Sequence, residues 1–236
     1  MHSAQKCCIF APAIERTAFC ALLGSSLKTY TGYKRWQAPV INEDPENGRN
    51  GAFWGGHTDW GIHDVEDMNA WVSLLRSKNP QMQIGFHGVS LGAAMALIYS
   101  ASDEGKQMKF YVADSSYGDL LDLGRDKLMK YTGDDRLVLG MDVLNPFFQA
   151  ALYMHTGKLL SDIDPVNRVQ HMTSPVLFLH GAKDQLVPPE VAELLLADSS
   201  STNKKLYIFQ GASHTMEMSA NGPAYREYVT DFIKNT

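Results

Sequence analysis

The chain has 236 residues, of which 44% are hydrophobic and 20% are charged. This composition excludes a disordered or collagen-like chain, and the length suits one α/β domain over residues 1–236. The formal net charge of −5 argues against a nucleic-acid partner, because such proteins hold phosphates through a basic face. Every apolar run is shorter than the roughly 18 to 20 residues that cross a bilayer, so we expect no membrane span.

The N-terminal 48 residues carry the weakest structural signals. Residues 7–11 are apolar enough for a buried strand, whereas residues 18–23 fit either a strand or a helical turn. Asn, Asp, Glu, Pro and Gly dominate residues 42–50 and predict a loop. The three cysteines all lie in this segment and match neither a disulfide framework nor a zinc site, so we expect a reducing, cytoplasmic location.

From residue 64 onward the sequence alternates between helical and strand patterns. Apolar residues at three- and four-residue spacing predict an amphipathic helix over residues 64–77. Further helices are predicted at residues 91–100, 190–197 and 224–234, and strands at residues 83–87, 110–113, 176–180 and 206–209. Continuous apolar strands that alternate with helices predict an α/β fold, with a mostly parallel sheet covered by helices on both faces.

A longer insertion separates the second and third of these strands. Residues 117–165 contain two helical segments, at residues 120–131 and 146–160, which is more than a crossover between parallel strands requires. We expect them to form a small helical cap inserted before the strand at residues 176–180. Its largest apolar side chains would form a roof over the site: Phe147, Phe148, Tyr153 and Met154.

The strongest local motif is Gly-Val-Ser-Leu-Gly at residues 88–92, between a predicted strand and a predicted helix. A serine at such a turn has a strained backbone and presents its hydroxyl above the sheet edge, and the flanking glycines permit the close approach of strand and helix. The amide of Leu91 then faces a developing oxyanion at a helix N-terminus. Ser90 is therefore a candidate nucleophile, with helix capping as the structural alternative.

A serine needs a base, and the base needs an orienting acid. Asp184 follows the predicted strand at residues 176–180, and His214 follows the next strand at residues 206–209. The order serine, acid, histidine places all three at the same edge of a parallel sheet. Turn capping by Asp184 and a surface position for His214 are the structural alternatives.

Other titratable residues have simpler explanations. His87 and His180 lie at strand ends and are expected to pack or to bond the backbone. A cluster of histidines and aspartates could suggest a metal site, but loop polarity and helix capping explain its members more simply: His57, Asp59, His63, Asp64 and Asp67. We expect no metal and no organic cofactor.

These motifs resemble those of the α/β-hydrolase superfamily, and more narrowly of its bacterial, cap-bearing serine aminopeptidase-like and esterase-like members. The likeness begins near residue 49 and is close at residues 87–94, around the serine turn. The resemblance implies Ser90, Asp184 and His214 as the catalytic triad, with the Leu91 amide as one oxyanion donor. Some members carry an N-terminal anchor, which we do not expect here.

The N-terminal segment departs from the family pattern. Members have a strand ending in His-Gly, after which a backbone amide supplies the second oxyanion donor, and no His-Gly pair precedes Gly51 here. The remnant strand is followed by Pro12, which has no amide hydrogen to donate. We therefore expect residues 1–48 to be divergent or truncated strands. Losing one oxyanion donor typically costs about two to three orders of magnitude in rate.

The sequence thus predicts a serine hydrolase that cleaves a small carboxylic ester or related acyl substrate through an acyl-enzyme intermediate. A peptidase or amidase with the same triad is one alternative, because the chemistry is shared. A catalytically weak hydrolase fold kept for binding is another, and it would hold Ser90 and His214 apart. The expected partner is a small acyl or peptide molecule.

Overall fold

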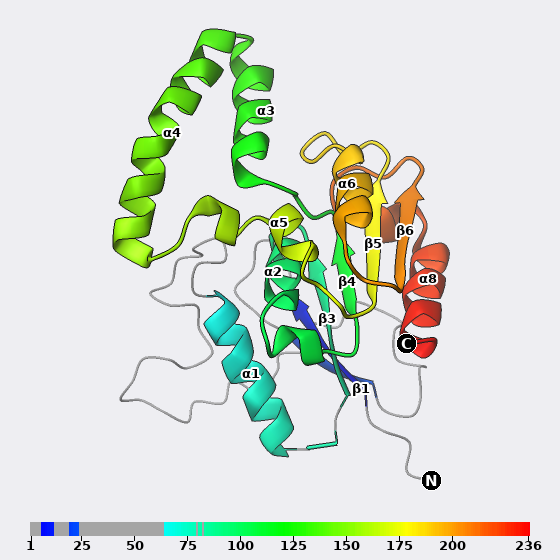
Figure 1. The fold of residues 1–236 in the computed structure, drawn as a ribbon. Coiled ribbons are helices and arrows are strands. Elements are labelled where there is room, and N and C mark those ends of the chain that lie inside the picture. Colours follow the sequence, from blue (N-terminus) through cyan, green and yellow to red (C-terminus); the bar gives the residue numbers. More distant parts are fainter. Residues whose placement is uncertain (1–5, 12–18, 24–63, 79, 82) are drawn as a thin grey trace.

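The computed structural model describes residues 6–11, 19–23, 64–78, 80–81 and 83–236 (Figure 1). For the first two of these segments only the backbone is described. The other predictions made for the N-terminal segment, including the loop at residues 42–50, lie outside the described residues.

In the described part of the chain, six strands form one sheet in the order β2-β1-β3-β4-β5-β6. Strand β2 pairs antiparallel with β1, and every other pairing is parallel. The predicted α/β fold with a mostly parallel sheet is therefore confirmed, and the segment left open between strand and helical turn is strand β2. The strands are β1 (Lys6–Ala11), β2 (Phe19–Leu23), β3 (Gln83–Val89), β4 (Tyr111–Asp114), β5 (Val176–Gly181) and β6 (Lys204–Phe209).

Helices connect the strands and cover the sheet (Figure 1). The α-helices are α1 (Asp64–Lys78), α2 (Leu91–Ser100), α3 (Leu120–Thr132), α4 (Asp135–Thr156), α5 (Pro165–Val169), α6 (Glu190–Asp198), α7 (Glu217–Ala220) and α8 (Gly222–Lys234). The described residues also include the short 3-10 helices η3 (Gly105–Gln107) and η4 (Leu160–Asp162).

The two faces of the sheet form two separate apolar cores, because successive strand residues point to opposite sides. Tyr111 and Phe178 face the core built with α1, α2 and α6. Val112 and Leu177, one position away on the same strands, face the core built with α8. All four side chains are essentially fully buried, and each such burial contributes roughly 1.5 to 3 kcal/mol. Both cores extend to the ends of the strands and hold the loops there in place.

Helices α3 and α4 form a hairpin that projects from the body of the molecule (Figure 1). Each helix begins at a capping aspartate and ends at a glycine with positive φ. Asp119 accepts a hydrogen bond from the amide of Asp122 at the start of α3, and Gly133 ends that helix with a φ of 64°. Asp134 caps α4, and Gly157 ends it with a φ of 71°. The sharp turn between the helices follows from these adjacent stop and start signals.

Helix α4 begins at Asp135, eleven residues before the predicted start at residue 146. Pro146 therefore lies inside the helix and does not begin it. The proline removes one backbone donor, but the cap at Asp134 and the bonds on either side sustain a helix of 22 residues. Contacts with α3 also hold this part of α4, where Asp142 accepts hydrogen bonds from Arg125 at 2.8 Å. The prediction treated proline as a helix start, and that assignment was wrong.

Helix α4 turns Asp142 and Gln149 towards the protein and many of its large apolar side chains outward. Asp142 bonds Arg125 on α3, and Gln149 accepts the amide of Leu160 at 3.0 Å. None of the residues of α4 is buried. The side chains expected to form a roof over the site are instead exposed, with Phe147 at 73%. The exposed apolar side chains of α4 are Leu137, Leu139, Val143, Leu144, Phe147, Phe148, Tyr153 and Met154.

By length and composition alone, α4 could cross a membrane, and it is the one such helix in the described part of the chain. This helix was not predicted from the sequence as a possible membrane span, because Asp142, Asn145 and Gln149 interrupt the apolar run. In the folded chain, Asp142 and Gln149 are hydrogen-bonded to other protein groups. Length and composition do not test the expectation of no membrane span, which stays a prediction.

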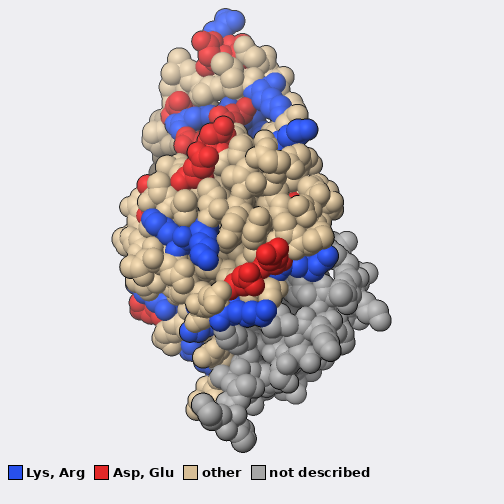
Figure 2. Space-filling model, turned by 90° about the vertical axis from the view of Figure 1, so that its right-hand side faces the viewer, with Lys and Arg blue, Asp and Glu red and all other residues tan. Residues whose placement is uncertain are grey.

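On the face that includes β6 and α8, basic and acidic side chains are interspersed (Figure 2). This face carries both signs of charge and shows no large basic area of the kind that binds phosphate backbones.

Candidate active site

Ser90 occupies a sharp turn between β3 and α2. Its backbone has a φ of 54° and a ψ of −117°, which is strained for a residue with a side chain. The amide of Ser90 donates to the carbonyl of Asp114 at 2.8 Å and ties the turn to the neighbouring strand β4. A Cβ atom at Gly88 would lie 2.1 Å from the carbonyl oxygen of Gly92, so only glycine permits this crossing of strand and helix.

The structure brings together the three side chains that the sequence singled out. Ser90 Oγ lies 2.8 Å from Nε2 of His214, and Nδ1 of His214 lies 2.6 Å from Oδ2 of Asp184. They come from the carboxyl ends of three parallel strands of the sheet: Ser90 after β3, Asp184 after β5 and His214 after β6. Their side chains therefore form one relay of hydrogen bonds at the carboxyl edge of the sheet.

Asp184 is held as a carboxylate by four hydrogen bonds. Its Oδ1 accepts the amides of Leu186 and Val187 at 2.8 and 2.9 Å, and its Oδ2 accepts His214 and, at 3.2 Å, His180. Burial alone would raise the pKa of Asp184, but the bonds from His180, His214 and Val187 outweigh it and hold the pKa well below its ordinary value. A carboxylate of this kind fixes the imidazole of His214 with Nδ1 as the donor.

His180 is a second, buried histidine beside the same carboxylate. Its Nε2 lies 2.9 Å from the carbonyl oxygen of Val187, so Nε2 carries the hydrogen and shares it with Asp184. Burial lowers the pKa of His180, but the bonds to Asp184 and Val187 outweigh this and raise it. The sequence analysis expected a packing or backbone-bonding role, and the contact with Asp184 adds a second function as a support for the acid.

The Leu91 amide lies at the first position of α2, directly after Ser90. Amides of a first helical turn have no partner within their helix, so this N–H is available to a negative charge above Ser90. The segment in which family members carry the second donor, and where none was expected here, lies outside the described residues, as do His57, Asp59 and His63.

A set of buried polar side chains behind the relay was missed by the sequence analysis. Ser115 Oγ lies 2.8 Å from Oε1 of Glu217 and 3.2 Å from Oδ1 of Asp114, and it accepts the amide of Thr215 at 3.2 Å. The hydroxyl of Tyr225 donates to Oδ2 of Asp114 at 2.7 Å. Glu217 lies only three residues after His214, but nothing in its neighbouring sequence signals burial.

His87 joins this set through Tyr225. Its Nε2 lies 2.9 Å from the Tyr225 hydroxyl, and since that hydroxyl donates to Asp114, His87 donates to it. Burial lowers the pKa of His87 to about 4, so its imidazole is neutral at physiological pH. The expectation that His87 packs beside the serine turn agrees with its burial, but its polar role could not be read from the sequence.

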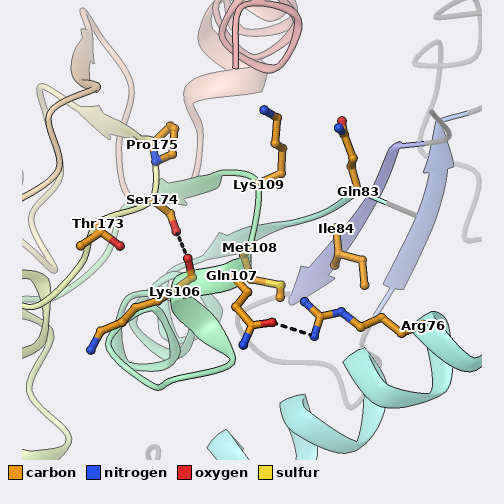
Figure 3. A pocket seen from close by; sticks show the side chains of 10 residues that line it. All are labelled: Arg76, Gln83, Ile84, Lys106, Gln107, Met108, Lys109, Thr173, Ser174 and Pro175. Carbon is orange, nitrogen blue, oxygen red and sulfur yellow. Dashed lines mark hydrogen bonds between the residues drawn. The ribbon is translucent and has the colours of Figure 1, made fainter. Parts of the chain in front are cut away.

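A cavity of about 430 Å³ lies at the opposite edge of the sheet, at the amino ends of β3, β4 and β5 (Figure 3). Arg76 and Lys109 line it, and Arg76 donates to Gln107 at 3.1 Å. The relay is at the carboxyl ends of the strands, so this cavity is not part of the site. Among the described residues we find no group of three or more His, Cys, Asp or Glu side chains placed to hold a metal ion.

The fold and the site define a class of protein: this chain has the α/β-hydrolase fold, and a serine, a histidine and an aspartate are aligned at the carboxyl edge of its sheet. More narrowly, it belongs to the prolyl oligopeptidase family, whose model matches residues 46–236. The resemblance to esterase-like and peptidase-like α/β-hydrolases is thereby confirmed.

One curated relative is YqkD of Bacillus subtilis, an uncharacterized protein that is 30% identical over 188 residues. The match covers 79% of this chain and 60% of that protein. This chain therefore spans about three fifths of the length of that relative.

Solved structures with a similar fold include both esterases and peptidases. The esterase Pf2001 of Pyrococcus furiosus superposes with a TM-score of 0.56 at 22% identity, over 77% of this chain and 65% of the esterase. A puromycin-hydrolyzing peptidase of Mycobacterium tuberculosis superposes with a TM-score of 0.57 at 21% identity, over 75% of this chain and 26% of the peptidase. At this level of identity the likeness establishes the fold.

Proposed function

We propose that the protein hydrolyses a small carboxylic ester through an acyl-enzyme intermediate, with Ser90 as nucleophile, His214 as general base and Asp184 as the orienting acid. The observation that carries this proposal is the relay itself, with 2.8 Å between Ser90 and His214 and 2.6 Å between His214 and Asp184. Both distances allow direct proton transfer and orientation without rearrangement. A hydrolase fold kept only for binding would not need this alignment.

In the first half of the reaction, Ser90 Oγ attacks the ester carbonyl while Nε2 of His214 takes its proton. The resulting oxyanion lies at the N-terminus of α2, where the Leu91 amide donates to it. Asp184 stabilises the imidazolium, and the four hydrogen bonds that it accepts keep it ionised. Collapse of the intermediate breaks the ester bond, and His214 gives its proton to the leaving alcohol.

In the second half, water attacks the acyl-enzyme. His214 takes one proton from the water, the acyl–oxygen bond to Ser90 breaks, and the proton returns to Ser90 Oγ. The carboxylic acid leaves and the relay is restored. No cofactor is required, because the proton taken in each half is returned in the same half.

The test compares three forms of the protein with p-nitrophenyl acetate and with a fluorophosphonate probe. The wild-type chain should turn over the ester and be labelled at Ser90, whereas Ser90→Ala should lose both. Ser100→Ala is the matched control, because Ser100 is fully buried on α2 and bonds only the carbonyl of Leu97. Turnover or labelling that persists in Ser90→Ala would refute the proposal.

A peptidase or amidase reaction with the same three residues is the second candidate. The family that the chain belongs to is named for a peptidase, and one structural neighbour hydrolyses puromycin. We favour an ester over an amide substrate because an alcohol is a better leaving group than an amine. Ester hydrolysis therefore needs less stabilisation of the oxyanion. Matched aminoacyl esters and aminoacyl p-nitroanilides separate the two: a kcat/KM for the anilide equal to that for the ester would favour the peptidase.

A further inference from the structure

Three non-glycine residues in the described part of the chain have positive φ: Ser90, Ser115 and Thr215. Two of them are in direct contact, because the amide of Thr215 donates to Oγ of Ser115 at 3.2 Å. Thr215 directly follows His214 in the chain. Strained backbone of this kind persists only where neighbouring groups hold it, and it is frequent at functional sites. The hydroxyl of Ser115 therefore holds the backbone next to the imidazole of the relay.

The surroundings of Ser115 determine where hydrogen atoms lie. Its Oγ is within hydrogen-bond distance of two carboxyl groups, Glu217 at 2.8 Å and Asp114 at 3.2 Å, and it already accepts the amide of Thr215. A serine hydroxyl has one hydrogen and can donate it to only one of the two carboxyl groups. With both contacts as hydrogen bonds, the other carboxyl group donates to the serine and therefore carries a proton.

The two distances favour Asp114 as the protonated member of the pair. The shorter bond, 2.8 Å from Ser115 to Glu217, makes Glu217 the acceptor of the single serine hydrogen and leaves the longer, 3.2 Å contact for Asp114. Asp114 and Glu217 are almost completely buried, and neither has an ion-pair partner among the described residues. Burial and the nearby charge of Glu217 raise the pKa of Asp114 well above its ordinary value.

The other titratable groups around the pair fit the same arrangement. Tyr225, from α8, donates to the second oxygen of Asp114 and accepts from the neutral His87 of β3. His180, on β5, lies close enough to Glu217 to feel its charge. Groups from β3, β4, β5, α7 and α8 thus converge on these two carboxyl groups.

We propose that Asp114 and Glu217 form a singly protonated carboxyl pair, bridged by the Ser115 hydroxyl, that positions His214 for proton transfer. The inference rests on the proposed function, in which His214 is the general base. Asp114, Ser115 and Glu217 are positioning residues: they act through the backbone of Thr215 and do not contact the ester. Losing the bridge releases the loop that carries His214.

The first experiment removes the bridging hydroxyl. In Ser115→Ala we expect kcat for p-nitrophenyl acetate to fall by about 100-fold, as small misplacements of a catalytic group do, while KM changes less than about threefold. The rate of fluorophosphonate labelling should fall in parallel, since it also needs His214. Ser100→Ala, which removes another buried serine hydroxyl, should match the wild-type chain. A folded Ser115→Ala protein with unchanged kcat and labelling rate would overturn the proposal.

A second pair of variants covers the case in which Ser115→Ala does not fold. Glu217→Gln keeps an acceptor oxygen for Ser115, whereas Glu217→Leu has a similar size but no acceptor. We expect kcat of the Gln variant to stay within about threefold of wild type and that of the Leu variant to fall by more than about tenfold. Equal values of kcat for these two variants would contradict a positioning role.

The shared proton has its own measurement, independent of turnover. Infrared difference spectra at about pH 9, where Asp164 with its pKa of about 7 is ionised, should show the C=O stretch of one protonated carboxyl group in the wild-type chain. The band should disappear in Asp114→Asn and remain in Ser90→Ala. Its absence from the wild-type chain would overturn the shared proton. Turnover by Ser90→Ala tests the proposed function and not the shared proton. If that variant stays active, the proposed function is refuted while the infrared result for the carboxyl pair still stands.

Discussion

The amide nitrogen of Thr215 lies 3.2 Å from Oγ of Ser115, and the residues that make this contact are 100 positions apart in the sequence. One follows strand β4 and the other follows strand β6. The bond passes across the carboxyl end of the intervening strand β5, so the loop that carries His214 is anchored to a part of the sheet that it does not adjoin. Several consequences can be measured.

Replacing Asp184 by asparagine should reduce kcat for p-nitrophenyl acetate by about 10⁴-fold. The amide would present an N–H or a weaker acceptor to Nδ1 of His214, which at 2.6 Å now donates to a carboxylate. The imidazole would then favour the wrong tautomer for accepting the Ser90 proton. Asp103→Asn, at an exposed position, serves as the control and should retain wild-type activity. A loss of less than about tenfold in Asp184→Asn would contradict the assigned role.

The turn at Ser90 should store measurable strain. Ser90→Gly and Ser90→Ala both remove the hydroxyl, but only glycine relaxes a φ of 54°. We expect the free energy of unfolding of the glycine variant to exceed that of the alanine variant by about 1 kcal/mol. Urea titrations of the two variants give the difference directly. Equal stabilities would mean that the turn is relaxed.

Replacing a glycine by alanine should have opposite effects on stability at Gly88 and Gly140. In Gly88→Ala the new Cβ would lie 2.1 Å from the backbone oxygen of Gly92, so β3 and α2 would have to separate. We expect a loss of more than about 3 kcal/mol or no folded protein. Gly140→Ala places its Cβ in open space within α4 and should stabilise the chain by about 0.5 to 1 kcal/mol. Thermal unfolding of both variants tests the pair.

Asp164 should make stability depend on pH near neutrality. Its carboxyl group accepts the amide of Leu120 at the start of α3, and burial raises its pKa to about 7. Between about pH 4 and pH 7 the folded chain retains a proton that the unfolded chain has lost, so this contribution to stability is complete below pH 4 and declines as the pH rises. The slope approaches about 1.4 kcal/mol per pH unit.

The Asp164→Asn variant retains an oxygen for Leu120 but has no such proton. The difference in unfolding free energy between the wild-type chain and this variant should therefore change between about pH 4 and pH 7 and level off above that range. A difference that is constant with pH would show that Asp164 has an ordinary pKa. Asp103→Asn again provides the comparison.

Substitutions on the two sides of helix α4 should affect surface hydrophobicity and stability separately. Phe147→Ser removes a 73% exposed ring and should shorten retention on a hydrophobic-interaction column while changing the unfolding free energy by less than about 0.5 kcal/mol. Gln149→Ala, on the side facing the protein, breaks the bond to the Leu160 amide and should do the reverse, with a loss of about 1 kcal/mol. Identical behaviour of the two variants would contradict the observed orientation of the helix.

The sequence allowed the relay to be predicted because each member follows a strand and the chain order restricts the alternatives. Ser90 was marked by flanking glycines, and Asp184 and His214 by loops after apolar runs. The start of α4 was misplaced because Pro146 was read as a helix boundary, although capping by Asp134 sustains an earlier start. Exposure of the apolar side chains could not be foreseen, since an apolar pattern does not reveal which side faces the protein.

The buried carboxyl pair could not be predicted for a different reason. Asp114 ends a strand and Glu217 follows a histidine, and acidic residues at such positions usually face water. Their burial depends on Tyr225, which is 111 residues from Asp114 in the sequence and reaches it only through the packing of α8 on β4 and β5. Tertiary contacts of this range leave no local pattern in a single sequence.

Helix α8 consequently has two roles that cannot be varied independently. Val229 and Phe232 fill one of the two apolar cores, while Tyr225, one to two turns earlier on the same helix, supplies a hydroxyl to the acid beside the His214 loop. Any substitution that shifts this helix along the sheet also displaces that hydroxyl. Substitutions in the apolar core under α8 are therefore constrained by the need to keep the Tyr225 hydroxyl within hydrogen-bond distance of Asp114.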